Sequence, residues 1–269
     1  MKHYVHAELL NRPVKIVLVG GGGNGSRVLE HLICLHKAMV AKGHPFGLDV
    51  LLIDHDTVSE ANIGRQAFYP CDVGSYKALT LINRANMALG DTGWDAGIER
   101  LTPESTALRD ADIVIGAVDN RAARHAIVTC LQQSYSDRVY YLDLGNKSGT
   151  GQVVLGEIPC KKKGCDSPWL LPHVGELFPE LVNPLLDTDD DDTPSCSLAE
   201  ALERQSLFVN PAVSLWAGNL LWQLFTVGEI ENHGCFVNVD SMTVLPLEID
   251  QQTWARYGVQ RHLEHVSSS

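Results

Sequence analysis

The stretch that decides the fold is VKIVLVGGGGNGSRVLEHLICL, residues 14–35. It begins with an apolar run from Val14 to Val19, which is typical of a strand buried on both faces. Glycines follow from Gly20 to Gly25, and then a helical pattern continues as far as Gly43. The stretch therefore predicts a strand, a glycine turn and a helix in direct succession.

The same alternation of strand and helix continues to about residue 150. We expect further strands at 48–53, 94–99, 112–118 and 139–144, and helices at 74–89 and 120–132. Right-handed crossovers between such strands build a mostly parallel sheet. The expected fold class is therefore α/β and Rossmann-like, with helices on both faces of the sheet and its ligand site at the carboxyl ends of the strands.

The pattern changes after about residue 150. GQVVLGEI predicts a strand with no helix after it, and residues 159–195 are irregular and rich in Pro and Asp. We expect helices at about 198–205 and 212–227, then a hairpin of strands 235–239 and 243–247. We predict one domain over 1–269, with a nucleotide-binding half at about 14–155. The remainder, about 156–269, would supply a crossover loop, helices and an antiparallel extension.

The composition narrows the possible partners and the compartment. The net charge of −12 argues against binding to nucleic acid or to an anionic membrane surface. The N-terminal residues lack the apolar core of a signal peptide, and seven irregularly spaced cysteines favour a reducing cytoplasm. Cys160 and Cys165 lack a second close cysteine pair, so we expect no stoichiometric zinc.

The glycine loop and Asp54 indicate a nucleotide site but do not identify the nucleotide. Glycines allow the backbone to approach a phosphate closely, and the following helix N-terminus favours negative charge. Asp54 ends the second expected strand, where a carboxylate can accept the ribose hydroxyls. These features fit a nicotinamide or flavin dinucleotide, a methyl donor or ATP equally well.

The residues after Asp54 favour ATP. A dehydrogenase has no use for Arg65 a dozen residues beyond the ribose acid, and little use for Lys77 at the start of the next helix. Arginine offers a fork of donors and lysine a mobile point charge, and both suit a triphosphate. Asp119 follows the strand IVIGAV, where a carboxylate can hold Mg²⁺ against phosphate oxygens.

In combination these motifs resemble the ThiF/MoeB/HesA family, which includes the ubiquitin-activating enzymes. The resemblance rests on VGGGGNG, DHDTVSEANIGRQ, VGSYKA and VDNRAAR, which together cover about residues 14–155. The segment SCSLAEALERQSLFVNPAVSLWAGNLLWQLFTVG resembles the family's region of the reactive cysteine and following helices. More narrowly, the chain resembles the ThiF-like proteins of PRTRC systems of bacterial plasmids and mobile elements.

The resemblance implies ATP-dependent adenylation of the C-terminal carboxylate of a small β-grasp protein, either ubiquitin-like or a sulfur carrier. Mg²⁺ would be the metal cofactor. It also implies a homodimer, and the apolar late helix with Trp216 and Trp222 could supply its interface or belong to the core. A nicotinamide-dependent oxidoreductase and a nucleotide-binding module without turnover remain the alternatives.

The resemblance also assigns the nucleotide site residue by residue. The nucleotide loop comprises Gly20, Gly22, Gly23, Asn24 and Gly25. Position 24 is a departure, because the family commonly has an apolar residue there. Asp54 would hold the ribose, with Asp56 two residues further along in the same site.

The remaining assignments concern the phosphates, the metal and a thiol. Contacts to the phosphates would come from Asn62, Arg65 and Lys77. Gln66 would support them, while Asp119 would hold Mg²⁺ with Asn120 and Arg124 nearby. Cys196 precedes a helix start with capping-box spacing, where a thiolate is stabilised, and by family position could accept the activated carboxylate. The implied catalytic residues are therefore Arg65, Lys77, Asp119 and Cys196.

Overall fold

The computed structural model describes residues 1–90, 93–134, 136, 138–159, 170–187 and 206–261. Several sequence-based expectations lie outside these ranges: Cys160, Cys165, Cys196 and the helix at 198–205. In the described part of the chain, no helix combines the length and apolarity that crossing a membrane requires.

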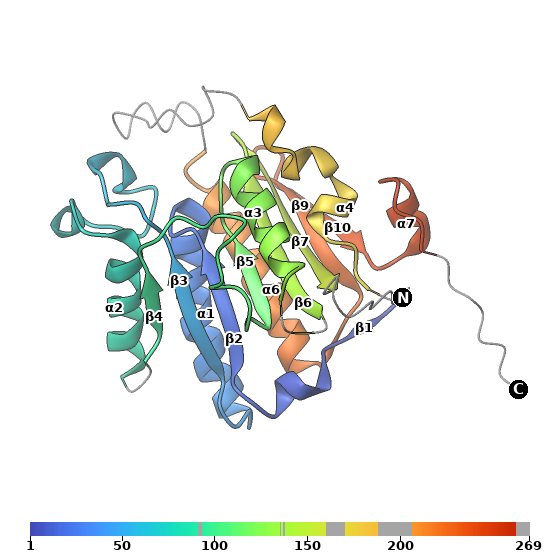
Figure 1. Ribbon diagram of the computed structural model, residues 1–269, viewed down its shortest axis with the longest axis horizontal. Coiled ribbons are helices and arrows are strands. Elements are labelled where there is room, and N and C mark those ends of the chain that lie inside the picture. Colours follow the sequence, from blue (N-terminus) through green and yellow to red (C-terminus); the bar gives the residue numbers. More distant parts are fainter. Residues whose placement is uncertain (91–92, 135, 137, 160–169, 188–205, 262–269) are drawn as a thin grey trace, which may run out of the picture.

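An eight-stranded mixed sheet forms the centre of the molecule (Figure 1). Its strand order is β10-β9-β7-β6-β5-β2-β3-β4. The five strands from β6 to β4 pair in parallel, whereas β7, β9 and β10 pair antiparallel. Their bounds are β2 Val14–Val19, β3 Leu48–Ile53, β4 Asp95–Gly97, β5 Ile113–Gly116, β6 Arg138–Asn146, β7 Thr150–Pro159, β9 Asn232–Asn238 and β10 Thr243–Glu248. The α/β, Rossmann-like expectation and the antiparallel extension are thus confirmed.

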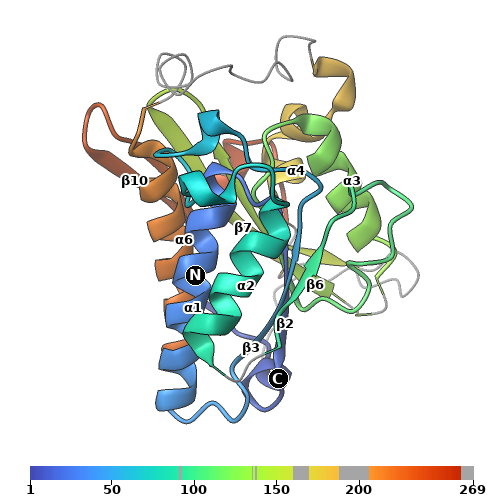
Figure 2. The same ribbon diagram turned by 90° about the vertical axis from the view of Figure 1, so that its left-hand side faces the viewer.

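Helices cover both faces of this sheet. Figure 2 shows α1, α2 and α6 on one face, and α3 with α4 on the other. The helices are α1 Gly23–Ala41, α2 Lys77–Leu89, α3 Arg121–Leu131, α4 Val174–Leu177, α6 Val209–Thr226 and α7 Gln251–Ala255. Short 3₁₀ turns occupy Ala7–Leu10, Glu60–Asn62, Pro70–Asp72, Pro179–Val182 and Pro184–Leu186. The terminal segments add a small antiparallel pair, β1 His3–Tyr4 with β8 Glu229–Ile230.

The buried apolar residues come from both parts of the chain. Strands β2, β5 and β6 are enclosed between the helical layers, which explains their nearly continuous apolar sequences. Helix α6 packs beside α1 and buries side chains against β6, β7 and β9. Examples of fully buried side chains from these elements are Leu18, Ile115, Leu142, Val154 and Leu221. The N-terminal and C-terminal parts therefore share one packed cluster.

Helix α6 begins earlier than the sequence pattern indicates. The expected start was residue 212, directly after Pro211, but the helix begins at Val209. Proline is tolerated there because the first-turn amides of a helix have no intrahelical acceptor. Trp216 and Trp222 are half-buried on α6 and pack against the core.

Candidate functional site

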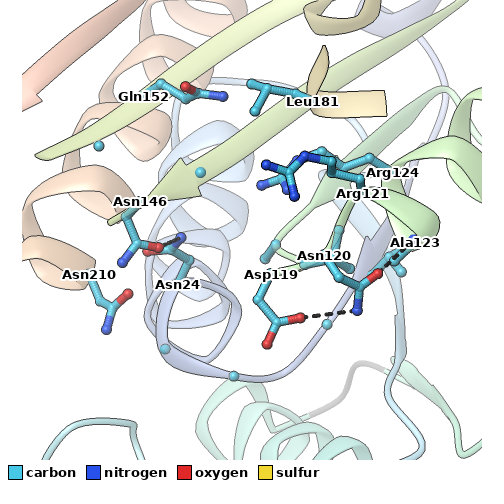
Figure 3. Close-up of a pocket in the computed structure, with 18 of the residues that line it drawn as sticks. Asn24, Asp119, Asn120, Arg121, Ala123, Arg124, Asn146, Gln152, Leu181 and Asn210 are labelled. Atoms are coloured by element: carbon cyan, nitrogen blue, oxygen red, sulfur yellow. Dashed lines mark hydrogen bonds between the residues drawn. The ribbon is translucent and has the colours of Figure 1, made fainter. Parts of the chain in front are cut away.

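The site lies where the order of the parallel strands reverses. The chain passes from β2 to β3 on one side, and later from β5 to β6 on the other, so β2 and β5 are neighbours. In open α/β sheets, this switch point opens a crevice at the carboxyl ends of the strands. The structure has a cavity of about 1130 Å³ at that edge, and Figure 3 shows part of its lining.

The glycine loop is shaped by two close backbone approaches. Gly20 has φ of +94°, and a Cβ there would lie 2.6 Å from the Ala117 carbonyl oxygen. A Cβ on Gly25 would lie 1.8 Å from the carbonyl oxygen of Gly20. Any larger residue at these positions would push β2, α1 and the β5 loop apart. Gly20, Gly22, Gly23 and Asn24 line the cavity, while Gly25 lies behind them inside α1.

Asp54 links the glycine loop to the end of β3. Its carboxylate accepts hydrogen bonds from the Gly21 amide, at 2.6 Å, and from the Asp56 amide, at 2.8 Å. Burial raises the pKa of Asp54, and this outweighs the opposite effects of Lys77 and the two amides. The side chain is 8% exposed and still lines the cavity, so it can receive a ligand while holding the loop.

Two cationic side chains face the cavity near Asp54. Lys77 is buried, and its Nζ donates to the Asp56 carboxylate at 2.9 Å. Arg65 is half-buried, and its pKa is lowered by burial against the opposing effect of the Asp119 charge. Asp119 is exposed at the end of β5. The cavity thus brings together two cations and three carboxylates predicted from separate motifs.

Asn120 connects Asp119 with the start of α3. Its Oδ1 accepts from the Ala123 amide at 2.8 Å and caps the helix, while its Nδ2 donates to Asp119 at 3.4 Å (Figure 3). Asn120 therefore fixes the direction in which the chain leaves β5.

Arg124 lines the cavity and forms a buried ion pair. Its Nε donates to Asp143 Oδ1 at 2.9 Å, and Asp143 is fully buried on β6. The Tyr141 hydroxyl donates to the same oxygen at 3.0 Å, and Gln152 reaches the other carboxylate oxygen at 3.4 Å. Despite burial, the pKa of Arg124 is raised, because the Asp143 carboxylate stabilises its charge. The pair holds Arg124 in one orientation at the cavity wall.

Asn62 and Gln66 were both predicted near the phosphates, but only Gln66 lines the cavity. Asn62 is not part of the cavity wall, because its Oδ1 accepts from the Ser59 amide at 2.9 Å and caps a 3₁₀ turn. Gln66 does line the cavity and is 7% exposed. Its Oε1 has no hydrogen-bond partner among the described residues. Gln66, rather than Asn62, thus presents a polar atom to the cavity.

Part of the cavity lining comes from residues that no sequence motif indicated. Asn146, Gln152, Leu181 and Asn210 all contribute to the wall, and they come from β6, β7, the segment after α4, and α6. These residues reach the cavity through long-range packing, which no local sequence pattern predicts. Asp143 did carry a signal, because it is a charged residue inside the apolar strand sequence VYYLDLG.

The carboxylates present are suitable for a hard cation. Mg²⁺ prefers oxygen ligands and commonly uses one or two carboxylates together with substrate phosphates. Asp119 offers an exposed carboxylate at the cavity, and ligand atoms of Asp54, His55 and Asp56 lie within 4.8 Å of one another. Asp56 is already paired with Lys77, so Asp119 is the better placed of these carboxylates for the metal.

The switch-point cavity, the glycine loop and the buried acid after β3 define an α/β protein of the Rossmann-like class. Comparison with known families gives the particular class. The chain matches the ThiF family over residues 8–246, and it belongs to that family.

The individual relatives share only low sequence identity with this chain. The adenylyltransferase and sulfurtransferase UBA4 of Yarrowia lipolytica is 28% identical over 128 residues, which are 46% of this chain and 29% of the relative. A crystal structure of PaaA has a TM-score of 0.58 at 17% identity, covering 88% of this chain and 64% of that one. The E. coli tRNA N6-threonylcarbamoyladenosine dehydratase TcdA is 25% identical over 51% of this chain and 53% of its own, with a TM-score of 0.40. The chain thus spans less than two thirds of the relatives' lengths.

Proposed function

We propose that this protein uses ATP and Mg²⁺ to adenylate the C-terminal carboxylate of a small β-grasp protein, either a ubiquitin-like modifier or a sulfur carrier. One observation carries the proposal: Arg65, Lys77 and Asp119 face the same cavity as the glycine loop and Asp54. Membership of the ThiF family supports it, as does the partial similarity to an adenylyltransferase and sulfurtransferase.

The residues take separate roles in the proposed reaction. A carboxylate oxygen of the partner attacks the α-phosphorus of ATP, an acyl–phosphate bond forms, and the bond to pyrophosphate breaks. Charge builds on the phosphate oxygens during attack, and Arg65 and Lys77 are fixed cations that stabilise it there. Asp119 would hold Mg²⁺, which neutralises the departing pyrophosphate when bound. Asp54 would accept the ribose hydroxyls.

The further steps of the proposal concern assembly and transfer. The protein would act as a homodimer. The Cys196 thiolate would attack the acyl-adenylate, so that a thioester forms, the acyl–phosphate bond breaks and AMP leaves. The narrower resemblance to the ThiF-like proteins of PRTRC systems stays a prediction.

The proposed function is tested by ATP–pyrophosphate exchange with a small glycine-ending protein captured by pull-down. Arg65→Ala should lower exchange by about 10²- to 10³-fold, because a preorganised charge is lost from the transition state. Asp54→Ala should mainly raise the KM for ATP, since a ribose contact exists in ground and transition states alike. Arg256→Ala, an exposed arginine after α7, is the matched control and should exchange normally.

The alternatives predict different results. An oxidoreductase would be stabilised thermally by NAD(H) rather than by ATP with Mg²⁺. A binding module would be stabilised by ATP but would show no exchange with any glycine-ending partner. Either result would contradict the proposed adenylation.

A further inference from the structure

Two asparagines in the cavity leave one donor and one acceptor without partners in the part of the chain that the structure describes. Asn24 lies in the first turn of α1 and is 6% exposed, and Asn146 ends β6. Asn24 Nδ2 donates to Asn146 Oδ1 at 2.9 Å (Figure 3). The other two amide atoms, Asn24 Oδ1 and Asn146 Nδ2, are buried and have no hydrogen-bond partner among the described residues.

This arrangement is costly unless something pairs with it. A buried polar atom without a partner has lost its hydration with no hydrogen bond in return, and this pair of asparagines has two such atoms among the described residues. From Val28 onward the buried residues of α1 are apolar. An apolar residue at position 24 would remove one of the two unpaired atoms, Asn24 Oδ1. The pair therefore indicates a ligand that supplies both an acceptor and a donor.

The conclusion does not depend on how the amide groups are oriented. If both amides were reversed, Asn24 Oδ1 would accept from Asn146 Nδ2 instead. The unpaired atoms would then be Asn24 Nδ2 and Asn146 Oδ1. One donor and one acceptor remain in either case.

The position of the pair separates it from the nucleotide base. A purine edge can also present an adjacent donor and acceptor. However, Asp54 follows β3, while Asn146 ends β6 three strands away, which is about 14 Å along the sheet. The glycine loop and Asp119 lie between them, where the phosphates would bind. Because the base and the phosphates leave a ribose in opposite directions, a ribose at Asp54 directs the base away from the pair.

The wall beyond the pair suits an uncharged chain. Strands β7, β9 and β10 contribute cavity residues without a charged side chain in the described structure: Thr150, Gly151, Gln152, Phe236, Val237, Asn238, Thr243 and Leu245. Asn210 closes the adjacent corner, where a Cβ on Gly23 would lie 2.5 Å from its Nδ2. A neutral peptide backbone has the matching chemistry, since each peptide unit carries one donor and one acceptor.

We propose that Asn24 and Asn146 bind one peptide unit in the C-terminal tail of the protein that is adenylated. In the orientation described, Asn24 Oδ1 accepts from the tail N–H, and Asn146 Nδ2 donates to the tail carbonyl. The pair thereby fixes the register of the tail, so that its carboxylate reaches the phosphates beyond the glycine loop. This inference rests on the proposed function for the identity of the peptide.

The test replaces a single N–H of the tail by an ester oxygen. The probe is a fluorescein-labelled hexapeptide that ends in two glycines, with matched depsipeptides carrying one ester each, and binding is followed by fluorescence anisotropy. At one position the ester should weaken binding to the wild type by about fivefold or more, as expected for one lost hydrogen bond. In Asn24→Leu, ester and amide probes should bind equally at that position.

Two further variants make the test specific. Asn24→Asp keeps an acceptor and should keep the preference for the amide. Asn11→Leu changes an exposed asparagine outside the cavity and should behave as the wild type. Equal ester penalties in the wild type, Asn24→Leu and Asn146→Leu would overturn the inference, and so would a wild type that does not bind the peptide. A penalty lost only in Asn146→Leu would support the inference with both amides reversed, because Asn146 Oδ1 then accepts from the tail N–H. The assay contains no adenylation step, so a failure of ATP–pyrophosphate exchange alone would refute the proposed function and leave the peptide subsite intact.

Discussion

Removing Asp143 should strongly destabilise the protein, because it leaves a buried guanidinium without its counter-charge. Arg124 is 5% exposed and Asp143 is completely buried, so water compensates poorly for the lost carboxylate. The Tyr141 hydroxyl also loses the acceptor that it reaches at 3.0 Å. Breaking a buried pair in this way typically costs about 3–5 kcal/mol. Since whole domains are stable by only about 5–15 kcal/mol, Asp143→Ala should lose a large fraction of the free energy of unfolding.

The measurement is urea denaturation followed by circular dichroism. Asp49→Ala is the matched control, because this exposed aspartate of β3 should change stability by less than about 0.5 kcal/mol. The double variant Arg124→Met with Asp143→Leu should recover most of the loss, since it removes both charges together. A loss below about 1 kcal/mol in Asp143→Ala would refute the reasoning that the pair is buried and mutually dependent.

Three further predictions concern pH, the thiol and assembly. His233 donates from Nδ1 to the Leu155 carbonyl and accepts from the Trp254 indole, and burial lowers its pKa to about 4. Because the unfolded chain binds the proton near pH 6.5 and the native protein does not, the free energy of unfolding should fall by about 3 kcal/mol as the pH drops from 6.5 to 4, and this contribution should be absent in His233→Gln. Cys196→Ala should abolish any reductant-sensitive covalent adduct with the partner, and an adduct that survives would place the reaction on another thiol. Light scattering should give twice the 29.5 kDa chain mass, whereas a monomer mass at every concentration would contradict the homodimer.

The parallel half was predictable because local sequence determines it. Six-residue stretches with five apolar residues each, followed by glycine or an acid, gave β2 and β3 with the same bounds that the structure shows. The positions of Gly20 and Asp54 follow from those strands, since each comes directly after a strand end. Their meeting at one edge follows from parallel pairing alone.

The remaining lining was not predictable, because it depends on contacts between segments far apart in the sequence. Gln152 and Asn210 reach the cavity through the antiparallel return of β7 and the packing of α6 on α1, which are long-range arrangements. Asn62 was expected at the phosphates, whereas its side chain caps the turn that begins at Ser59. The spacing of Ser59 and Asn62 is that of a capping box, so the sequence did contain this signal.

Carrier-dependent ATP–pyrophosphate exchange in Asp119→Ala tests the central claim most directly. Asp119 should hold the Mg²⁺ that neutralises the leaving pyrophosphate, so the variant should lose exchange by about 10²- to 10³-fold. Its circular dichroism should match the wild type, because Asp119 is exposed and its one hydrogen bond among the described residues is a long contact with Asn120. Asp110→Ala, an exposed aspartate outside the cavity, should retain full exchange. Exchange near the wild-type rate in folded Asp119→Ala would contradict adenylation at this site.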